Sequence, residues 1–125
     1  VYSALVTWDK ERLRELLAPG FEAVLPEGMP AGAGGRRIGA EAMIRDTWRA
    51  IGRAYEMAAE PSEWIPCADG RLLVIGRYRG RGRDTGLPVD AAFAHLWTAR
   101  DGRLVALWHV TDTALWAAAL EGAPA

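Results

Sequence analysis

The hydrophobic positions of the chain recur at helical spacing as far as residue 55. In the second helical segment, Asp9 is placed to cap the N-terminus, and Trp8 can pack against Leu13 as a hydrophobic staple. Pro19 and Gly20 would end that helix. The elements predicted for this half are helices within 1–7, 8–20 and 40–55, a short strand at 21–26 and a glycine- and proline-rich loop at 27–39.

From residue 55 onward the apolar positions follow the alternating period of β-strands. Asp101 and Gly102 separate two such segments and are a strong hairpin signal. Helices followed by a meander of antiparallel strands predict an α+β fold, with the helices packed on one face of the sheet. The predicted strands lie at 55–67 (interrupted by prolines), 70–80, 87–98 and 102–111, and a closing helix at 112–120 follows.

The Asp101-Gly102 turn also predicts which side chains share a face of the sheet. A two-residue turn pairs Arg100 with Arg103, and regular pairing from there places His95 opposite Trp108. His95 would then share a face with Trp108, and His109 would lie on the other face with Ala94, Leu96 and Leu107. Both faces are largely apolar, so we expect the helices to cover one and a second copy of the chain to cover the other, as a homodimer.

Composition restricts the class of protein. The 125 residues suit one domain spanning 1–125, and 50% hydrophobic with 25% charged residues is a globular composition. A net charge of −1 argues against nucleic-acid binding, and no apolar run has the ~20 residues of a membrane helix. The single cysteine, Cys67, cannot form an internal disulfide and fits a reducing, cytoplasmic location.

Two histidines and one cysteine do not make a metal-ligand cluster, so neither a metal nor another cofactor is predicted. The chain begins with VYSALVTWD, without methionine, in the pattern of a helix already under way. We therefore expect the start of the first helix to precede Val1.

Two stretches carry a resemblance to a known family. GAEAMIRDTWRAI, followed by GRYRG…TGLPVDAAFAHLWTARDGRLVALWHVTDTALWAAAL, resembles the SnoaL-like and ketosteroid-isomerase-like branch of the nuclear transport factor 2-like (NTF2-like) superfamily. The resemblance implies a cone-shaped fold, in which a curved, antiparallel-rich sheet wraps about three helices and encloses an apolar pocket. It also implies dimers formed through the convex sheet face. Members include isomerases, polyketide cyclases, dehydratases, hydrolases and non-catalytic binding modules, so the fold does not identify the activity.

The resemblance allows one activity to be tested by residue. Steroid isomerases of this family use a tyrosine on the first helix, a proton-carrying carboxylate before a proline, and an acid on a later strand. In this chain those positions fall on Val1, with Tyr2 one residue out of register, on Leu25 and on Ala94. Because apolar side chains cannot transfer protons, ketosteroid isomerisation by that mechanism is not expected.

The same resemblance indicates His109 as a catalytic acid or base. SnoaL-type cyclases carry such a residue in the last long strand, commonly after a tryptophan, and Trp108-His109 occupies that place. Histidine replaces the expected aspartate but titrates near neutrality. A core histidine bonded to a neighbour is the alternative. The predicted pocket contains Phe21, Leu25, Trp48, Val74, Tyr78, Leu96, Leu107 and His109.

Two functions follow from this pocket. The first is an enzyme of cyclase, isomerase, dehydratase or hydrolase type, performing acid–base chemistry on an apolar polycyclic, polyketide-like or terpenoid-like molecule. The alternative is a non-catalytic ligand-binding module of the same fold. In both, the partner is a small apolar molecule, and neither nucleic acid nor membrane is involved.

Overall fold

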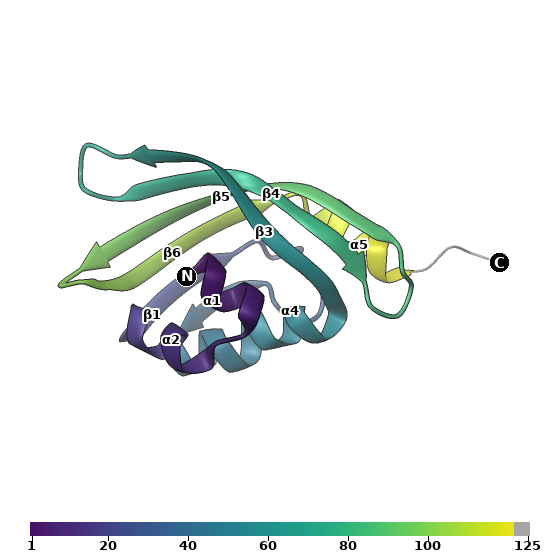
Figure 1. Ribbon diagram of the computed structural model, residues 1–125, viewed down its shortest axis with the longest axis horizontal. Coiled ribbons are helices and arrows are strands. Elements are labelled where there is room, and N and C mark those ends of the chain that lie inside the picture. The colour runs from purple at the N-terminus through teal and green to yellow at the C-terminus, as the bar shows by residue number, and fades with distance from the viewer. Residues whose placement is uncertain (122–125) are drawn as a thin grey trace.

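The computed structural model describes residues 1–121, apart from the side chain of Val6. A curved six-stranded sheet bends over the N-terminal helices and the long central helix, and α5 lies at one end of it (Figure 1). The sheet order is β2-β1-β6-β5-β4-β3; β1 runs parallel to β6, and all other neighbours are antiparallel. The helices are α1 (Tyr2–Thr7), α2 (Lys10–Leu16), α3 (Ala40–Ala42), η1 (Met43–Trp48), α4 (Arg49–Ala54) and α5 (Thr113–Glu121). The strands are β1 (Leu17–Leu25), β2 (Gly35–Ile38), β3 (Tyr55–Pro66), β4 (Leu72–Gly82), β5 (Pro88–Arg100) and β6 (Arg103–Thr111). The predicted α+β architecture is therefore confirmed.

The first helix, α1, ends at Thr7 as predicted, and α2 begins at its predicted cap but ends earlier than predicted. The Asp9 side chain accepts a hydrogen bond from the backbone N–H of Arg12 at 3.1 Å, which caps α2. However, α2 ends at Leu16, and β1 begins at Leu17. Pro19 thus lies inside the strand, where the pairing of β1 with β6 is irregular, and β1 is longer than predicted.

The third helical segment is continuous from α3 through η1 to α4. Its middle turn, η1, is a π-helix, a wider turn that often accompanies functional sites. Met43, Ile44 and Thr47 are buried there against the core, and Trp48 is half-buried. The loop predicted at 27–39, just before this helix, contains a short strand, β2, which pairs with β1.

The edge strand β3 was predicted to be interrupted by prolines, but it runs without a break over 12 residues. The irregularity is confined to a bulge between Pro61 and Glu63. Because β3 pairs only with β4, its other side is an open edge of the sheet.

The β5–β6 hairpin has the predicted turn and a different register. Asp101 and Gly102 have φ values of 53° and 79°, as a two-residue turn of the primed type requires, and Arg100 pairs with Arg103. Pairing then shifts by one residue, because Ala99 faces Leu104 and Thr98 faces Ala106, so Val105 is an extra residue in β6.

The shift reverses the predicted faces of β5. His95 lies opposite His109, not opposite Trp108, and both histidines point to the inner face beside the helices. Leu96 lies opposite Trp108, and Ala94 opposite Val110, on the outer face. The predicted separation of the two histidines was wrong, because a single added residue changes the face of every side chain beyond it.

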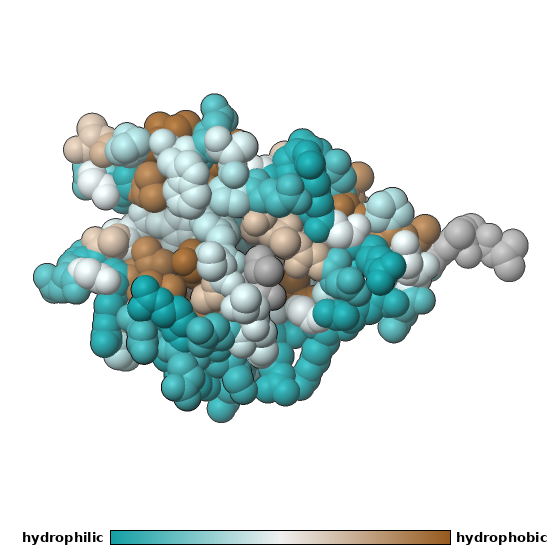
Figure 2. Space-filling model, viewed as in Figure 1, coloured by the Kyte–Doolittle hydropathy of each residue, from teal (hydrophilic) through white to brown (hydrophobic). Residues whose placement is uncertain are grey.

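The outer face of the sheet carries an apolar row across five strands. The pairing aligns Ile65, Leu73, Leu96, Trp108 and Val24 in that order from β3 to β1. Trp108 is 60% exposed on this face. By contrast, hydrophilic residues cover the solvent side of the helices, and hydrophobic side chains appear between helices and sheet (Figure 2). Within residues 1–121, no helix combines the length and hydropathy needed to cross a membrane.

Candidate functional site

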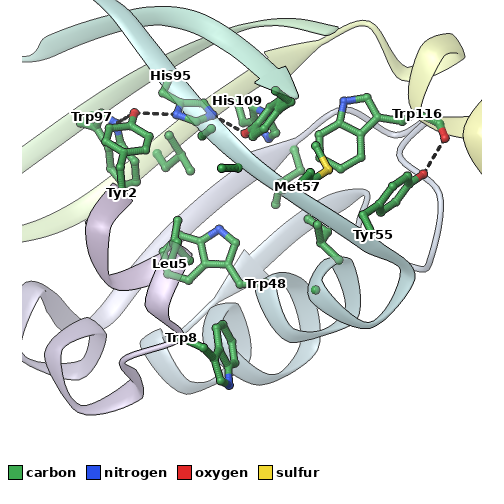
Figure 3. A pocket seen from close by; sticks show the side chains of 17 residues that line it. Tyr2, Leu5, Trp8, Trp48, Tyr55, Met57, His95, Trp97, His109 and Trp116 are labelled. Atoms are coloured by element: carbon green, nitrogen blue, oxygen red, sulfur yellow. Dashed lines mark hydrogen bonds between the residues drawn. The ribbon is translucent and has the colours of Figure 1, made fainter. Parts of the chain in front are cut away.

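A cavity of about 100 Å³ lies between the inner face of the sheet and the helices, partly open to solvent. Side chains from α1, β1, η1, α4, β3, β4, β5, β6 and α5 surround it (Figure 3). None of the described residues that line the cavity is Asp, Glu, Lys or Arg. Aromatic and aliphatic groups form most of the wall: Leu5, Trp8, Leu25, Trp48, Ile51, Tyr55, Met57, Trp97, Leu107 and Trp116.

Two histidines and a tyrosine from adjacent strands form a hydrogen-bonded chain at this cavity. The Tyr78 hydroxyl lies 2.7 Å from Nε2 of His95 and 3.0 Å from Nε2 of His109. Both histidines are buried, with exposed fractions of 5% and 3%. The bulge in the β5–β6 hairpin brings them together, because it puts both on the inner face, next to Tyr78 of β4.

Tyr2 of α1 extends this chain from the helical side. Its hydroxyl lies 2.7 Å from Nδ1 of His95 and accepts a hydrogen bond from the indole N–H of Trp97 at 3.0 Å. The Tyr2 ring lies nearly parallel to the His95 ring, with centroids 5.7 Å apart. Tyr2 was set aside on sequence as one residue out of register, yet its hydroxyl is part of the site.

Burial keeps the four hydrogen-bonded side chains of the site, Tyr2, Tyr78, His95 and His109, uncharged at neutral pH. It lowers the pKa of His109 from 6.5 to about 4, and it lowers the pKa of His95 well below 6.5, with a smaller contribution from the charge of His109. Burial also raises the pKa of Tyr2 to about 12, against an opposing effect of the Trp97 hydrogen bond, and raises the pKa of Tyr78 well above 10. The site therefore offers neutral donors and acceptors rather than a charged acid or base.

Two buried polar atoms of the described residues have no hydrogen-bond partner. One is Nδ1 of His109, at the end of the hydrogen-bonded chain. The other is the hydroxyl oxygen of Thr47 in η1, a residue that does not line the cavity. Unpartnered buried polar atoms are costly and uncommon, so the free nitrogen of His109 calls for an explanation from function.

The structure brings together most of the residues predicted from sequence. Three predicted residues do not line the cavity, and one of them, Leu96, is put on the outer face by the register shift. Phe21 and Val74 are fully buried in the adjacent core and do not reach the cavity. The predicted residues that line it are Leu25, Trp48, Tyr78, Leu107 and His109.

The sequence prediction missed the other half of the site. His95 was placed on the wrong face, and Tyr2 and Trp97 were not assigned to the pocket. Tyr55 and Trp116 also line the cavity, and the Tyr55 hydroxyl donates to the Trp116 carbonyl oxygen at 2.6 Å. The tryptophans near the C-terminus indicated that Trp116 could belong to the pocket. Whether its side chain points into the cavity depends on how α5 packs against the sheet.

The cavity contains no arrangement suited to a metal ion. Within the part of the chain that the structure describes, no three His, Cys, Asp or Glu side chains are grouped as ligands.

Comparison with known proteins identifies the family. A family model described as the SnoaL-like domain matches residues 1–107. No curated protein has a significantly similar sequence. An NTF2-like protein of unknown function from Burkholderia pseudomallei is 28% identical, with a TM-score of 0.85, covering 97% of this chain and 92% of that one.

Two further structures have the same fold. TerC, co-crystallised with polyporic acid, is 28% identical, with a TM-score of 0.84 and coverage of 97% of this chain and 92% of that chain. A putative SnoaL-like polyketide cyclase from Jannaschia is 19% identical, with a TM-score of 0.76 and coverage of 92% and 80%; it bears on the fold alone. The chain belongs to the SnoaL-like family and has the NTF2-like fold.

Proposed function

We propose that this protein binds an uncharged, largely apolar ring compound in the cavity and acts on it by acid–base chemistry. The observation that carries the proposal is the hydrogen-bonded chain of Tyr2, His95, Tyr78 and His109 inside an otherwise apolar cavity. Buried titratable groups are costly to fold around, and they concentrate where chemistry needs them. His109, as expected from the sequence, and Tyr2 are the groups proposed to exchange protons with the substrate.

The cavity size limits what can enter. At about 100 Å³ it is smaller than the ~150 Å³ of an apolar cavity known to hold benzene, so one small ring is the most that fits inside. A polycyclic, polyketide-like or terpenoid-like substrate would place one ring in the cavity and extend through its open side. The lack of charged lining residues favours a neutral substrate, since an ion would be desolvated without a partner.

The reaction class follows from the neutrality of the site. Groups that stay uncharged at pH 7 suit reactions that take one proton from the substrate and return one to it, such as isomerisation, cyclisation or dehydration. TerC, which is 28% identical, has been co-crystallised with polyporic acid, and this supports a small organic ligand for the present chain too.

Tryptophan fluorescence tests ligand binding directly, because four tryptophans line the cavity: Trp8, Trp48, Trp97 and Trp116. Titration with hydroxylated ketones and phenols is expected to change the emission saturably. Ala59 lines the cavity and pairs with Tyr78, so Ala59→Phe should fill the space and weaken binding at least about tenfold, the equivalent of ~1.4 kcal/mol.

The control for that variant is Ala68→Phe, in the exposed turn between β3 and β4. It adds the same ring away from the cavity and should bind as the wild type does. Equal binding by the wild type and a folded Ala59→Phe protein would place the ligand elsewhere. If every ligand binds saturably and none is converted to a product, the alternative function, a non-catalytic binding module, would be supported instead.

We also propose a homodimer formed through the outer face of the sheet. The apolar row that includes Leu96 and Trp108 is continuous across five strands, and Trp108 in it is 60% exposed in the single chain. An aromatic centre of this kind is typical of protein interfaces. Trp108→Glu is expected to weaken the dimer about a hundredfold or more, since it would bury an unpaired charge.

Sedimentation velocity over a concentration series measures that change. Leu115→Glu, a change at a 42% exposed residue of α5, is the control and should leave the dimer intact. A wild-type protein that sediments as a monomer at all concentrations would disprove the dimer.

A further inference from the structure

The cavity opens to solvent beside Gly52 of α4. Among the described residues that line the cavity, Gly52 is the only exposed one, and all the others are buried or half-buried. Met57 and Ala58 of β3, the strand that directly follows α4, also line the cavity and are half-buried. The mouth of the cavity therefore lies between α4 and the first residues of β3.

A side chain at position 52 would point toward this mouth. Trp48, Ile51 and Gly52 are spaced at i, i+3 and i+4, so they share one face of the helix. Trp48 and Ile51 both line the cavity, and Figure 3 shows the Trp48 ring projecting from the helix into the space below the sheet. Gly52 thus leaves a gap in a row of large apolar side chains.

None of the usual structural reasons for a glycine applies at position 52. Its φ is not positive, unlike that of Gly39 or Gly102. A Cβ atom added to Gly52 would meet no atom of the surrounding structure within 4 Å, so no neighbour lies too close for a side chain. Gly52 does not end the helix either, because α4 continues to Ala54.

A glycine at this position also has a cost. In a helix interior, glycine lowers the folding equilibrium constant about fivefold relative to alanine, because it loses more backbone freedom on folding. Nε of Arg83 donates a hydrogen bond to the Gly52 carbonyl oxygen at 2.8 Å, but the backbone of any residue could accept that bond. What only glycine provides here is free space at the mouth of the cavity.

We propose that Gly52 determines the size of the ligand, because the space beside it lets a flat apolar compound of two or more fused rings reach from the cavity into the mouth. This ligand class rests on the proposed function, which takes the cavity as the ligand site. At about 100 Å³ the cavity holds one ring, so a second ring has to lie in the opening. Ile51 and Met57 line that opening with apolar side chains, which favours an apolar second ring.

Isothermal titration calorimetry with phenol and 2-naphthol measures this selection. The two compounds carry the same hydroxyl group and differ by one fused ring. The wild type is expected to bind 2-naphthol at least about tenfold more tightly, because the second ring buries apolar area in the mouth. Equal affinities would overturn the proposal, since the mouth would then contribute nothing to binding.

Gly52→Leu fills the space beside α4. It is expected to weaken 2-naphthol binding about tenfold or more and to change phenol binding less than about threefold. The matched control is Gly20→Leu, since Gly20 is likewise exposed, has no positive φ and has room for a side chain, but lies in β1 and does not line the cavity. The control should bind both compounds as the wild type does.

Gly52→Ala tests whether the fold itself requires the glycine. One added methyl group should raise the folding equilibrium constant about fivefold, measured by urea unfolding, and weaken 2-naphthol binding about threefold. A glycine that the fold requires would give the opposite change in stability, so a less stable Gly52→Ala protein would overturn the proposal. This variant also provides the binding test if Gly52→Leu does not fold.

Failure of the proposed function would give a different result from failure of the size selection. If neither compound binds to the wild type, the proposed function fails, and the size selection fails with it. If both compounds bind and a folded Gly52→Leu protein keeps wild-type affinity for both, only the size selection is overturned. Equal weakening of both compounds by Gly52→Leu would overturn it as well, because the change would then act on the whole cavity rather than on the second ring.

Discussion

Lowering the pH from 7 to 4 is expected to reduce the free energy of unfolding by at least about 3 kcal/mol, from His109 alone. The unfolded chain protonates its histidines near pH 6.5, whereas burial holds the pKa of His109 in the folded protein at about 4. Between these two values the unfolded state binds more protons, so stability falls as the pH falls. The loss from His109 is about 2 kcal/mol at pH 5 and about 3 kcal/mol at pH 4. His95 adds to it in the same direction, because its pKa is also lowered by burial.

Urea unfolding at pH 7, 6 and 5 measures this effect in a window above the titration of exposed carboxylates. The control is the double variant His95→Gln/His109→Gln, which contains no histidine. Its stability at pH 7 will be lower, but its dependence on pH over this range should be nearly flat. A double variant as acid-sensitive as the wild type would show that the histidines are not the groups responsible.

His109→Gln is expected to lower turnover of the identified ligand by about 10²- to 10⁴-fold, the usual contribution of a general acid or base. Glutamine can still bond to the Tyr78 hydroxyl, but it has no second ring nitrogen and cannot exchange tautomers. Ligand affinity should change by less than about threefold, since the cavity wall keeps its volume and polarity. Single-turnover rates and fluorescence titrations separate the two quantities.

Two comparisons make that result specific to the hydrogen-bonded chain. His95→Gln should cause a similar loss, and the double variant should be little worse than either single one, because groups that act as a unit are not additive. Thr47→Val removes the other unpartnered buried atom of the described residues, the Thr47 hydroxyl oxygen, which lies outside the cavity, and should leave turnover unchanged. Full activity in folded His109→Gln would remove His109 from the chemistry.

The sequence predicted the order of elements well because their boundaries carry chemical signals. Asp9 caps α2 through its side chain, and Asp101-Gly102 adopts the two positive φ values that this residue pair favours. The bulge near Thr98 has no such signal, since its extra residue, Val105, is an ordinary strand former. Once that residue is missed, the hairpin pairing assigns the side chains of β5, His95 among them, to the wrong face.

The candidate site was predictable only in part, for the same reason. His109 and Tyr78 were identified, but His95 was lost to the register shift. Tyr2 depends on the rotation of a short helix against the sheet, which residue spacing does not determine. Phe21 and Val74 show a different limit: apolar alternation identifies inward-facing residues without telling a packed core from a cavity wall.

The long edge strand β3 has a consequence for how copies of the protein can meet. The unpaired backbone groups of an exposed strand edge can form hydrogen bonds with a strand of another molecule. The 12 residues of β3 would offer a long edge for such pairing. Pro61 and Pro66 offer no amide hydrogen to another strand, and Glu63 adds an exposed charge at the bulge. The prolines that first looked like interruptions of a strand thus protect the protein from aggregating edge to edge.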